Sequence, residues 1–396
     1  MTAATSAFSY PLAQSTWGDE ERAAAHAVID SGHTTMGPQV AAFEARFARL
    51  LGARHAVMVN SGSSANLLAV AALAFTRRPL IAAGAVAIVP AVSWATTYYP
   101  LTQYGLTLRF VDIDAETLNF DLAALEAALD DTVRVVFAVN LLGNPNAFGE
   151  IERMLFGRDI TLIEDNCESL GARLDGRSAG TFGRIGTFST FFSHHISTME
   201  GGVCVTDDDE LHHILLSLRS HGWTRHLPWP NAVAEKDPRG SFHEAFRFVL
   251  PGYNVRPLEV SGAIGLAQLD RLPALIARRR ETAWRVQDRL AEMRGLRLQR
   301  EIGESSWFGF AITLAEGTNV SRDEVVRRLA AAGVESRPVA SGNFARQPVM
   351  VHLAHEAPGP LPNADTLHDR GFYIGNNALD DDGLGRLTAT LREALA

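Results

Sequence analysis

Short apolar runs alternate with segments of helical spacing between residues 55 and 165, and this alternation limits the fold more than any other feature. The apolar runs have the length of buried strands: "HAVMVN", "AVAIVPA", "TLRFVDID", "TVRVVFAVNLLG" and "ITLIEDN". Helical segments such as "SANLLAVAALAF" and "DLAALEAAL" lie between them. The pattern predicts an α/β fold with a mostly parallel sheet covered by helices on both faces. Ligands of such sheets bind at the carboxyl ends of the strands.

The pattern changes after about residue 205. Residues 223–245 are rich in proline, aromatic and polar residues, which predicts an irregular loop or hairpin. A long helical stretch begins at "PLEVSGAIGLAQL", and shorter strand and helix segments follow it. Because 396 residues can form two domains, we predict a large domain over residues 1–255 and a smaller α+β domain over residues 256–396.

Composition and charge exclude several classes of function. The only cysteines, Cys167 and Cys204, cannot build a disulfide framework or a four-cysteine cluster within one chain. The formal net charge is −9 and no basic stripe is present, so we expect no nucleic-acid partner. The N-terminus shows no signal peptide and the apolar runs are too short to span a membrane. We therefore expect a cytoplasmic protein without a membrane partner.

Serine and tryptophan residues follow three of the predicted strands and suggest a cradle for a flat, phosphorylated ligand. Ser63 and Ser64 lie in "NSGSSAN", where a helix begins, so they could hold a phosphate or simply cap the helix. Trp94 directly follows a strand and could stack on a flat ring or belong to the core. Ser189 lies in a later strand-like stretch and is placed to reach a phosphate.

Two acidic residues and two histidines are further candidates for site residues. Asp165 ends an apolar strand, where a carboxylate either caps a helix or needs a cationic partner such as a protonated ring nitrogen. Glu168 is three residues further on and could face the same ligand. The adjacent His194 and His195 have no acidic or cysteine ligands at metal-site spacing, so we predict no metal site.

Taken in order, the motifs resemble those of the DegT/DnrJ/EryC1/StrS sugar aminotransferase family, which are pyridoxal-phosphate (PLP) enzymes of fold type I. The resemblance extends over nearly the whole chain and includes "TMGPQVAAFEARFA", "VNSGSSANLLA", "PAVSWATT", "IEDNCESLGA", "GTFSTFFSHHISTMEGG" and "GYNVRPLEVSGAIGLAQL". It implies a large, mostly parallel sheet sandwiched by helices and a smaller C-terminal α+β domain.

The resemblance also implies roles for individual residues. Asp165 would pair with the pyridine nitrogen of PLP, Trp94 would stack on the ring, and Glu168 would lie near the ring hydroxyl. The phosphate would be held by three hydroxyl groups, those of Ser63, Ser64 and Ser189. Asn254 of "GYN" would reach the phosphate from the neighbouring subunit, which implies a homodimer with shared active sites.

One position departs from the family pattern. The Schiff-base lysine of the family lies six residues before the Glu of "EGG", and here that residue is His194. The only lysine, Lys236, belongs to the polar loop, and the sequence leaves open whether it reaches the site. Histidine at this position marks a subgroup, the sugar 3-dehydratases, which remove the C3 hydroxyl from 4-keto-6-deoxy nucleotide sugars.

The resemblance therefore implies a 3-dehydratase that binds PLP or pyridoxamine phosphate without a covalent bond. One branch of the subgroup needs a four-cysteine iron–sulfur cluster, which two cysteines cannot form. The chain thus resembles the cluster-free branch of the colitose pathway, which acts on GDP-4-keto-6-deoxy-D-mannose and takes its amino group from L-glutamate. His194 would be the general base, since imidazole suits proton transfer near neutral pH, and His195 is the competing candidate.

Substrate contacts and two alternative functions complete the expectations. His221 and Arg225 lie in a loop that resembles the substrate lid of the subgroup. Three further residues could reach the sugar, the nucleotide or the glutamate carboxylate, or could be ordinary surface residues: Arg337, Asn343 and Arg346. The alternatives are a nucleotide-sugar aminotransferase and a PLP-binding paralogue without catalysis. The sequence does not decide which sugar and nucleotide are bound.

Overall fold

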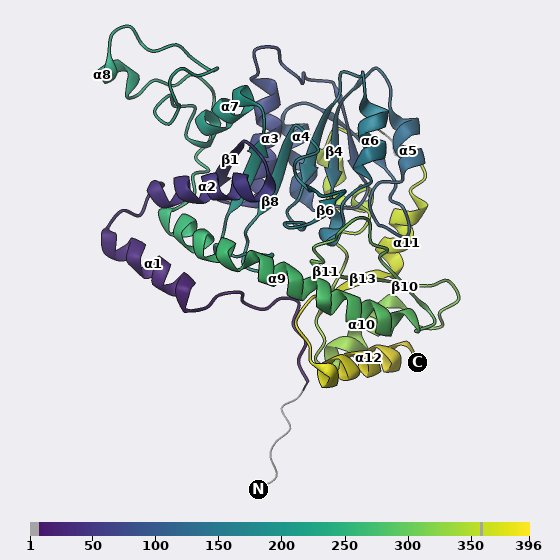
Figure 1. The fold of residues 1–396 in the computed structure, drawn as a ribbon. Helices are drawn as coiled ribbons and strands as arrows, with labels where there is room; N and C mark the ends of the chain where they lie inside the picture. Colours follow the sequence, from purple (N-terminus) through teal and green to yellow (C-terminus); the bar gives the residue numbers. More distant parts are fainter. Residues whose placement is uncertain (1–7, 357–358) are drawn as a thin grey trace.

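The computed structural model describes residues 8–356 and 359–396, and a seven-stranded sheet forms its centre (Figure 1). The strand order is β1-β9-β8-β5-β4-β2-β3, and all strands are parallel except β9, which is antiparallel to both neighbours. The strands are β1 His55–Val59, β2 Val86–Pro90, β3 Thr107–Val111, β4 Val133–Val139, β5 Thr161–Asp165, β8 Ile185–Ser189 and β9 Gly202–Thr206. The predicted mostly parallel sheet is confirmed.

Helices cover both faces of this sheet. One face packs on α3, α4 and α7, and the other packs on α2, α5, α6 and the first half of α9. The helices of this region are α1 Asp19–Ser31, α2 Pro38–Leu51, α3 Gly62–Ala74, α4 Ala95–Gln103, α5 Leu122–Ala128, α6 Phe148–Leu155, α7 Asp209–Arg219, α8 Ser241–Glu244 and α9 Glu259–Ala291, with the 3₁₀ turn η1 Leu141–Gly143. Helix α2 illustrates the local signals, because Pro38 begins it and Gly52 ends it in a left-handed conformation.

A second, antiparallel sheet of four strands forms the C-terminal part, in the order β10-β11-β13-β12. Its strands are β10 Leu296–Leu298, β11 Gly309–Leu314, β12 Ser336–Arg337 and β13 Gly371–Gly375. Its helices are α10 Arg322–Ala331, α11 Pro362–Arg370 and α12 Asp381–Leu395, with the 3₁₀ turns η2 Phe344–Arg346 and η3 Pro348–His352. The short strands β6 Arg173–Leu174 and β7 Arg177–Ser178 form a separate hairpin.

The long helix α9 runs past both sheets (Figure 1). Its first half packs in the core under β1, β8 and β9, through residues such as Leu272. Its second half packs with the small sheet through Val286 and Leu290, and Tyr10 from the N-terminal segment joins that core. The predicted boundary at residue 255 thus falls just before a helix that contributes to both cores, and the domain division stays a prediction.

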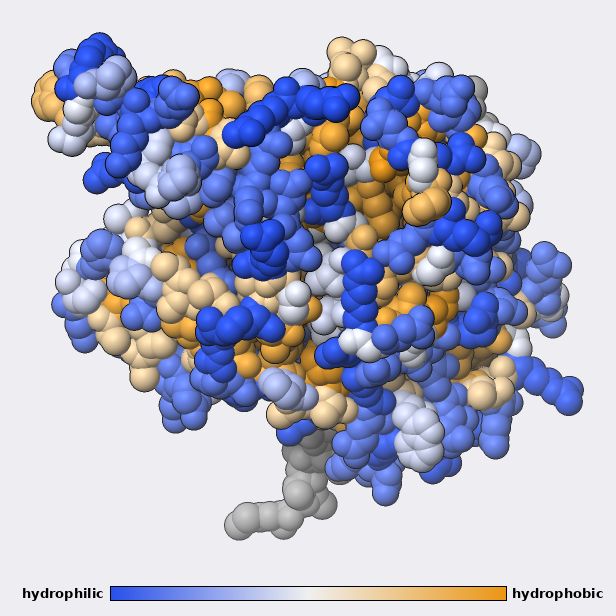
Figure 2. Space-filling view, turned by 45° about the horizontal axis from the view of Figure 1, so that its top comes forward, coloured by the Kyte–Doolittle hydropathy of each residue, from blue (hydrophilic) through white to orange (hydrophobic). Residues whose placement is uncertain are grey.

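The loop predicted over residues 223–245 is irregular, apart from α8, and it projects from the body of the molecule beside α7 (Figure 1). In the space-filling view, hydrophilic side chains cover most of one face and apolar ones fill the recesses between them (Figure 2). Within the described residues, no helix is long and apolar enough to cross a membrane. The first seven residues of the N-terminus, for which we expected no signal peptide, lie outside the described part.

Candidate active site

The turn between β1 and α3 forms one side of the site. Ser61 caps α3, since its hydroxyl accepts the Ser64 N–H at 3.1 Å, so neither Ser63 nor Ser64 is the cap. A Cβ atom at Gly62 would lie 2.6 Å from Cβ of Ser189, which shows how closely the turn approaches the end of β8. The structure thus brings the three predicted phosphate-binding serines together at a helix N-terminus, where free N–H groups and the helix dipole favour an anion.

Asp165 is buried at the carboxyl end of β5 and accepts hydrogen bonds only from neutral groups. The amide of Asn66 and the hydroxyl of Thr97 both donate to Oδ2 at 2.8 Å, and the Cys167 N–H donates to Oδ1 at 3.1 Å. Neutral donors leave the charge of a buried carboxylate without a cationic partner, and a protonated ring nitrogen would supply one. The sequence interpretation did not identify Asn66 or Thr97, although both lie in motifs that it singled out.

Trp94 lies at the N-cap of α4 and is 62% exposed. It is therefore not a core residue, which was the other interpretation of the sequence. The first turn of α4 contacts α3, because the hydroxyls of Thr96 and Ser63 are 2.9 Å apart. The exposed indole thus stands at the same sheet edge as the serines and Asp165, where it is free to stack on a flat ligand.

Glu168 is anchored by the turn η1 and lies near a tyrosine of the small sheet. Its Oε2 accepts the N–H of Leu142 at 2.9 Å, and Leu142 holds a left-handed backbone, with φ of 53°. Burial and the nearby charge of Asp165 raise the pKa of Glu168 to about 7, against the lowering effect of the Leu142 N–H. Burial and the charge of Glu168 also raise the pKa of Tyr373 to about 12. Tyr373 also packs on Phe308, whose ring contacts that of His194, so it is a residue of the site that no sequence signal indicated.

The two adjacent histidines differ in burial and in hydrogen-bond partners. His195 is buried, and its Nε2–H donates to the carbonyl of Ser306 at 3.1 Å. His194 is only half-buried, and its ring packs edge-on against Phe308, with ring centroids 5.1 Å apart. Burial and the charge of Arg279 lower the pKa of His194 to about 4. At neutral pH its imidazole is therefore uncharged and able to accept a proton.

Two predicted substrate residues lie where the projecting loop begins. His221 has a φ of 63°, its N–H donates to the carbonyl of Tyr253 at 2.6 Å, and its ring lies 5.3 Å from that of Trp223. Arg225 is exposed and stands 5.8 Å from the same indole. Asn254 is exposed on the neighbouring segment and accepts a hydrogen bond from the Nε of its neighbour Arg256 at 3.0 Å.

The other three predicted substrate residues separate into two groups. Arg337 is exposed and lies opposite Tyr373 in the antiparallel pair of strands β12 and β13. Because the charge of Glu168 acts on the same tyrosine, Arg337 lies on the side of the site that holds Glu168. Asn343 is buried and donates to Oδ1 of Asp365 at 2.9 Å, and Arg346 pairs with the same carboxylate at 3.3 Å and with that of Asp369 at 3.0 Å. The last two residues thus have partners in α11, which does not favour a substrate role for them.

Lys236 lies over an aromatic ring of the projecting loop to which it belongs. Its ammonium group lies 5.6 Å from the ring centroid of Trp229, seven residues earlier in the chain. Figure 1 shows this loop extending away from the body of the molecule. Within residues 8–356 and 359–396, no group of three histidine, cysteine or acidic residues could hold a metal ion.

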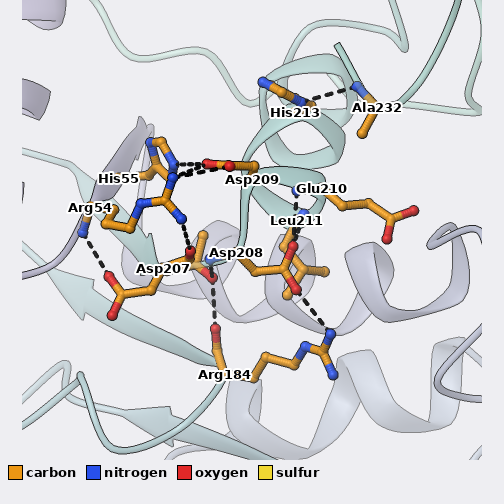
Figure 3. Close-up of polar contacts among 11 residues, drawn as sticks. Arg54, His55, Arg184, Asp207, Asp208, Asp209, Glu210, Leu211, His213 and Ala232 are labelled. Atoms are coloured by element: carbon orange, nitrogen blue, oxygen red, sulfur yellow. Dashed lines mark hydrogen bonds and ion pairs between the residues drawn. The ribbon is translucent and has the colours of Figure 1, made fainter.

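A charged surface cavity of about 550 Å³ lies at the opposite edge of the sheet, near the start of β1, β8 and α7 (Figure 3). It is lined by Arg54, Gly183, Arg184, Asp207, Asp208, Asp209 and Glu210. Both of its arginines are in ion pairs: Arg54 lies 2.8 Å from Asp209, and Arg184 lies 2.9 Å from Asp208. Two further carboxylates, Asp207 and Glu210, accept backbone N–H groups, so the cavity combines two ion pairs with an excess of acidic groups. At the other edge, no ion pair involves Asp165 or Glu168 within the described residues.

A profile of the DegT/DnrJ/EryC1/StrS aminotransferase family matches residues 15–389. The chain is 50% identical to the GDP-4-keto-6-deoxy-D-mannose 3-dehydratase of Yersinia pseudotuberculosis over 372 residues. The matched region covers 94% of this chain and 95% of the relative. The protein of the same name from Escherichia coli O55:H7 is 51% identical over 94% of this chain and 96% of its own length.

Solved structures of this relative match the fold closely. The E. coli dehydratase with bound hydrated PLP is 50% identical, with a TM-score of 0.95 over 98% of this chain and 100% of that one. Others hold a trapped PLP–glutamate geminal diamine, or GDP-perosamine in a histidine-to-asparagine variant. A further variant carries lysine for a histidine and asparagine for the serine directly before it. The chain belongs to the DegT/DnrJ/EryC1/StrS aminotransferase family.

Proposed function

We propose that the protein is a PLP-dependent 3-dehydratase that acts on GDP-4-keto-6-deoxy-D-mannose and uses L-glutamate as the amino donor. The relatives that are 50% and 51% identical over 94% of the chain carry this name, and their structures bind PLP and glutamate. The observation that carries the proposal is His194, a half-buried imidazole with a pKa of about 4 at the position of the family lysine.

The residues at the carboxyl edge of the sheet fit PLP. Asp165 would face the ring nitrogen, since its hydrogen-bond donors are neutral, and the exposed Trp94 would cover one face of the ring. The phosphate would lie at the N-terminus of α3, near Ser63, Ser64 and Ser189. When bound, PLP would carry the amino group from glutamate to C4 of the sugar and withdraw electrons from the reacting carbons.

His194 would move the protons of the reaction. As a neutral imidazole it would take a proton from the methylene carbon of the amino form of the cofactor and give one to the departing C3 hydroxyl. Imidazole has no amine with which to bind PLP covalently, so the cofactor would be held by the contacts above. In total, the keto sugar and glutamate would yield the 3-deoxy-4-keto sugar, 2-oxoglutarate and ammonia.

Two observations favour His194 over His195 as the base. His195 is buried and already donates to the Ser306 carbonyl, whereas His194 remains half-exposed. The relative with a solved serine–histidine double variant has serine directly before its histidine. Of the two adjacent histidines here, only His194 follows a serine, Ser193.

We also propose that two copies of the chain share their active sites, with Asn254 of one subunit reaching the phosphate of the other. The exposure of Asn254 and of Arg225 supports this, as do the exposed aromatic side chains of the projecting loop, Phe242 at 86% and Phe246 at 69%. His221, Arg225 and Arg337 would then contact the nucleotide sugar. The two cysteines are free, which fits a cytoplasmic protein.

An absorbance experiment tests the first half of the reaction. The purified protein is mixed with PLP, treated with borohydride, and analysed by mass spectrometry for a covalent adduct. A second sample receives L-glutamate instead. We expect no adduct, a shift from the aldehyde band to the pyridoxamine band, and release of 2-oxoglutarate.

His194→Lys is the matched control, because borohydride should attach the cofactor to its new amine. An adduct at Lys236 in the unaltered protein would contradict the proposal and favour an ordinary aminotransferase. Binding of PLP without any response to glutamate would favour the non-catalytic alternative.

A further inference from the structure

Arg279 of α9 is a half-buried cation, and its hydrogen-bond acceptors among the described residues are neutral. Its Nη1 donates to the carbonyl oxygens of Trp307 at 3.3 Å and Phe308 at 3.2 Å. Burial lowers its pKa to about 10, so the guanidinium stays charged at neutral pH. Because carbonyl groups do not cancel a full charge, Arg279 acts on titratable groups near it.

The segment that Arg279 holds, residues 305–308, forms the wall behind both histidines. The ring of Phe308 packs against that of His194, with centroids 5.1 Å apart, and the Ser306 carbonyl accepts from His195 at 3.1 Å. The same segment is fixed on η1, since the N–H groups of Ser306 and Phe308 donate to the carbonyls of Gly143 and Leu142, each at 2.9 Å. Leu142 in turn donates to Glu168, so the 305–308 segment connects both parts of the site.

The contact between this segment and η1 leaves little room for movement. A Cβ atom at Gly143 would lie 2.6 Å from the backbone nitrogen of Trp307. Trp307 and Leu142 both hold left-handed backbones, with φ values of 49° and 53°. Non-glycine residues keep such conformations only where the surroundings impose them. A shift of the 305–308 segment would therefore move the wall on which His194 rests.

We propose that Arg279 is a positioning residue for His194: its guanidinium holds the 305–308 segment, whose Phe308 ring packs on the imidazole, and so fixes a positive charge behind that segment. The inference rests on the proposed function, in which His194 is the base. The charge disfavours protonation of His194, in addition to burial, and so keeps the ring in the form that accepts a proton.

The other groups around His194 do not supply this charge. Residues 190–193 and the 305–308 segment carry no titratable side chain. His195 follows directly in the chain, and burial and the charge of Arg279 hold its pKa well below the ordinary value, so it is neutral. The ring of Tyr373 packs against that of Phe308, with centroids 6.4 Å apart. The raised pKa of Tyr373, about 12, keeps its hydroxyl uncharged.

The next residue of α9 provides a matched control. Arg280 anchors the same segment, because its Nε donates to the Ser305 carbonyl at 3.0 Å. Its charge, however, is paired with Glu304 at 3.0 Å, and its Nη2 donates to the Gly171 carbonyl at 3.0 Å. A variant at Arg280 therefore loosens the segment without removing an unpaired charge near His194.

The test is an NMR titration of ¹³C-labelled histidines in the cofactor-free protein, with the His194 signal assigned by its loss in His194→Asn. We expect Arg279→Gln to raise the pKa of His194 from about 4 toward the ordinary 6.5, and Arg279→Lys to keep it low. Arg280→Gln should leave it unchanged. An unchanged His194 pKa in Arg279→Gln, or an equal rise in Arg280→Gln, would overturn the proposal.

The pH dependence of turnover gives the second readout. In Arg279→Gln, the acid limb of the kcat profile should move to higher pH, because His194 becomes protonated and can no longer act as a base. Since the NMR titration needs neither cofactor nor sugar, it separates the two proposals. A shifted His194 pKa in a protein without dehydratase activity would contradict the proposed function and leave the role of Arg279 intact.

Discussion

The two edges of the central sheet differ in whether their carboxylates have cationic partners. At the amino-terminal edge, Arg54 and Arg184 pair with the aspartates before and within the first turn of α7 (Figure 3). At the carboxyl edge, Asp165 receives only neutral donors, and the pKa of Glu168 is raised to about 7 by burial and by Asp165. Paired charges stabilise the fold modestly, whereas buried carboxylates without a cation are costly and mark a place for a ligand.

The largest expected effect is on the reaction itself. His194→Asn should lower kcat by roughly 10²- to 10⁴-fold, the usual contribution of a general acid–base group, while PLP still binds. His195→Asn is the comparison, and it should lower the melting temperature by removing the buried bond to Ser306 but reduce kcat far less. Steady-state kinetics and PLP titrations of both variants measure this. A more active His194→Asn than His195→Asn would reverse the assignment.

Asp165→Asn should weaken PLP binding by roughly 10- to 100-fold, because a charge-assisted hydrogen bond contributes about 1.5–3 kcal/mol. The amide oxygen can still accept from Asn66 and Thr97, but the amide nitrogen that replaces Oδ1 cannot accept the Cys167 N–H. Without cofactor, the melting temperature should change little, because removal of a buried charge offsets the loss of the hydrogen bond from the Cys167 N–H. Equilibrium dialysis and thermal unfolding of the cofactor-free protein check both parts. A large loss of thermal stability would contradict this prediction, because it would show that Asp165 stabilises the folded protein without cofactor.

Glu168→Gln should change how stability depends on pH. The pKa of Glu168 is raised in the folded state, from 4.5 to about 7, so its protonated form favours folding. This contribution is complete below pH 4.5 and is lost as the pH rises toward 7. The variant should therefore be more stable than the unaltered protein at pH 7.5, by about 1–2 kcal/mol. Urea unfolding of the two cofactor-free proteins at pH 5 and 7.5 measures the difference in their unfolding free energies. An equal difference at both pH values would argue against a raised pKa of Glu168.

Asp208→Ala tests the opposite edge and has the smallest expected effect. Asp208 caps α7 and pairs with Arg184, so its loss should cost about 1–2 kcal/mol of unfolding free energy. Burial alone would raise its pKa, but the Arg184 and N–H contacts outweigh burial and lower it. The stabilisation is thus present above pH 3.8 and lost as the pH falls through the lowered pKa. Urea unfolding measures the loss, and a changed kcat would contradict the separation of the two edges.

The local pattern of the sequence predicted the parallel strands and the residues that directly follow them. Ser63, Trp94 and Asp165 could be found because each lies next to a strand in the chain, and strand ends meet at one edge. Tyr373 and Arg279 could not, because the small sheet and α9 bring them to the site from far along the chain.

Two further questions depended on contacts that no sequence spacing encodes. His194 and His195 are neighbours, and only the Ser306 contact shows which of them is already engaged. Asn343 and Arg346 have partners in α11 that lie about twenty residues further along the chain, so the sequence alone did not reveal these contacts. Their substrate role stays a prediction.

Product analysis tests the central claim most directly. The protein is incubated with PLP, L-glutamate and GDP-4-keto-6-deoxy-D-mannose, and ammonia, 2-oxoglutarate and the sugar products are quantified. We predict equal amounts of ammonia and 2-oxoglutarate, together with a GDP-linked 4-keto-3,6-dideoxy sugar. Accumulation of a GDP-linked 4-amino sugar without release of ammonia would contradict the account, because the protein would then transfer the amino group and retain the C3 hydroxyl.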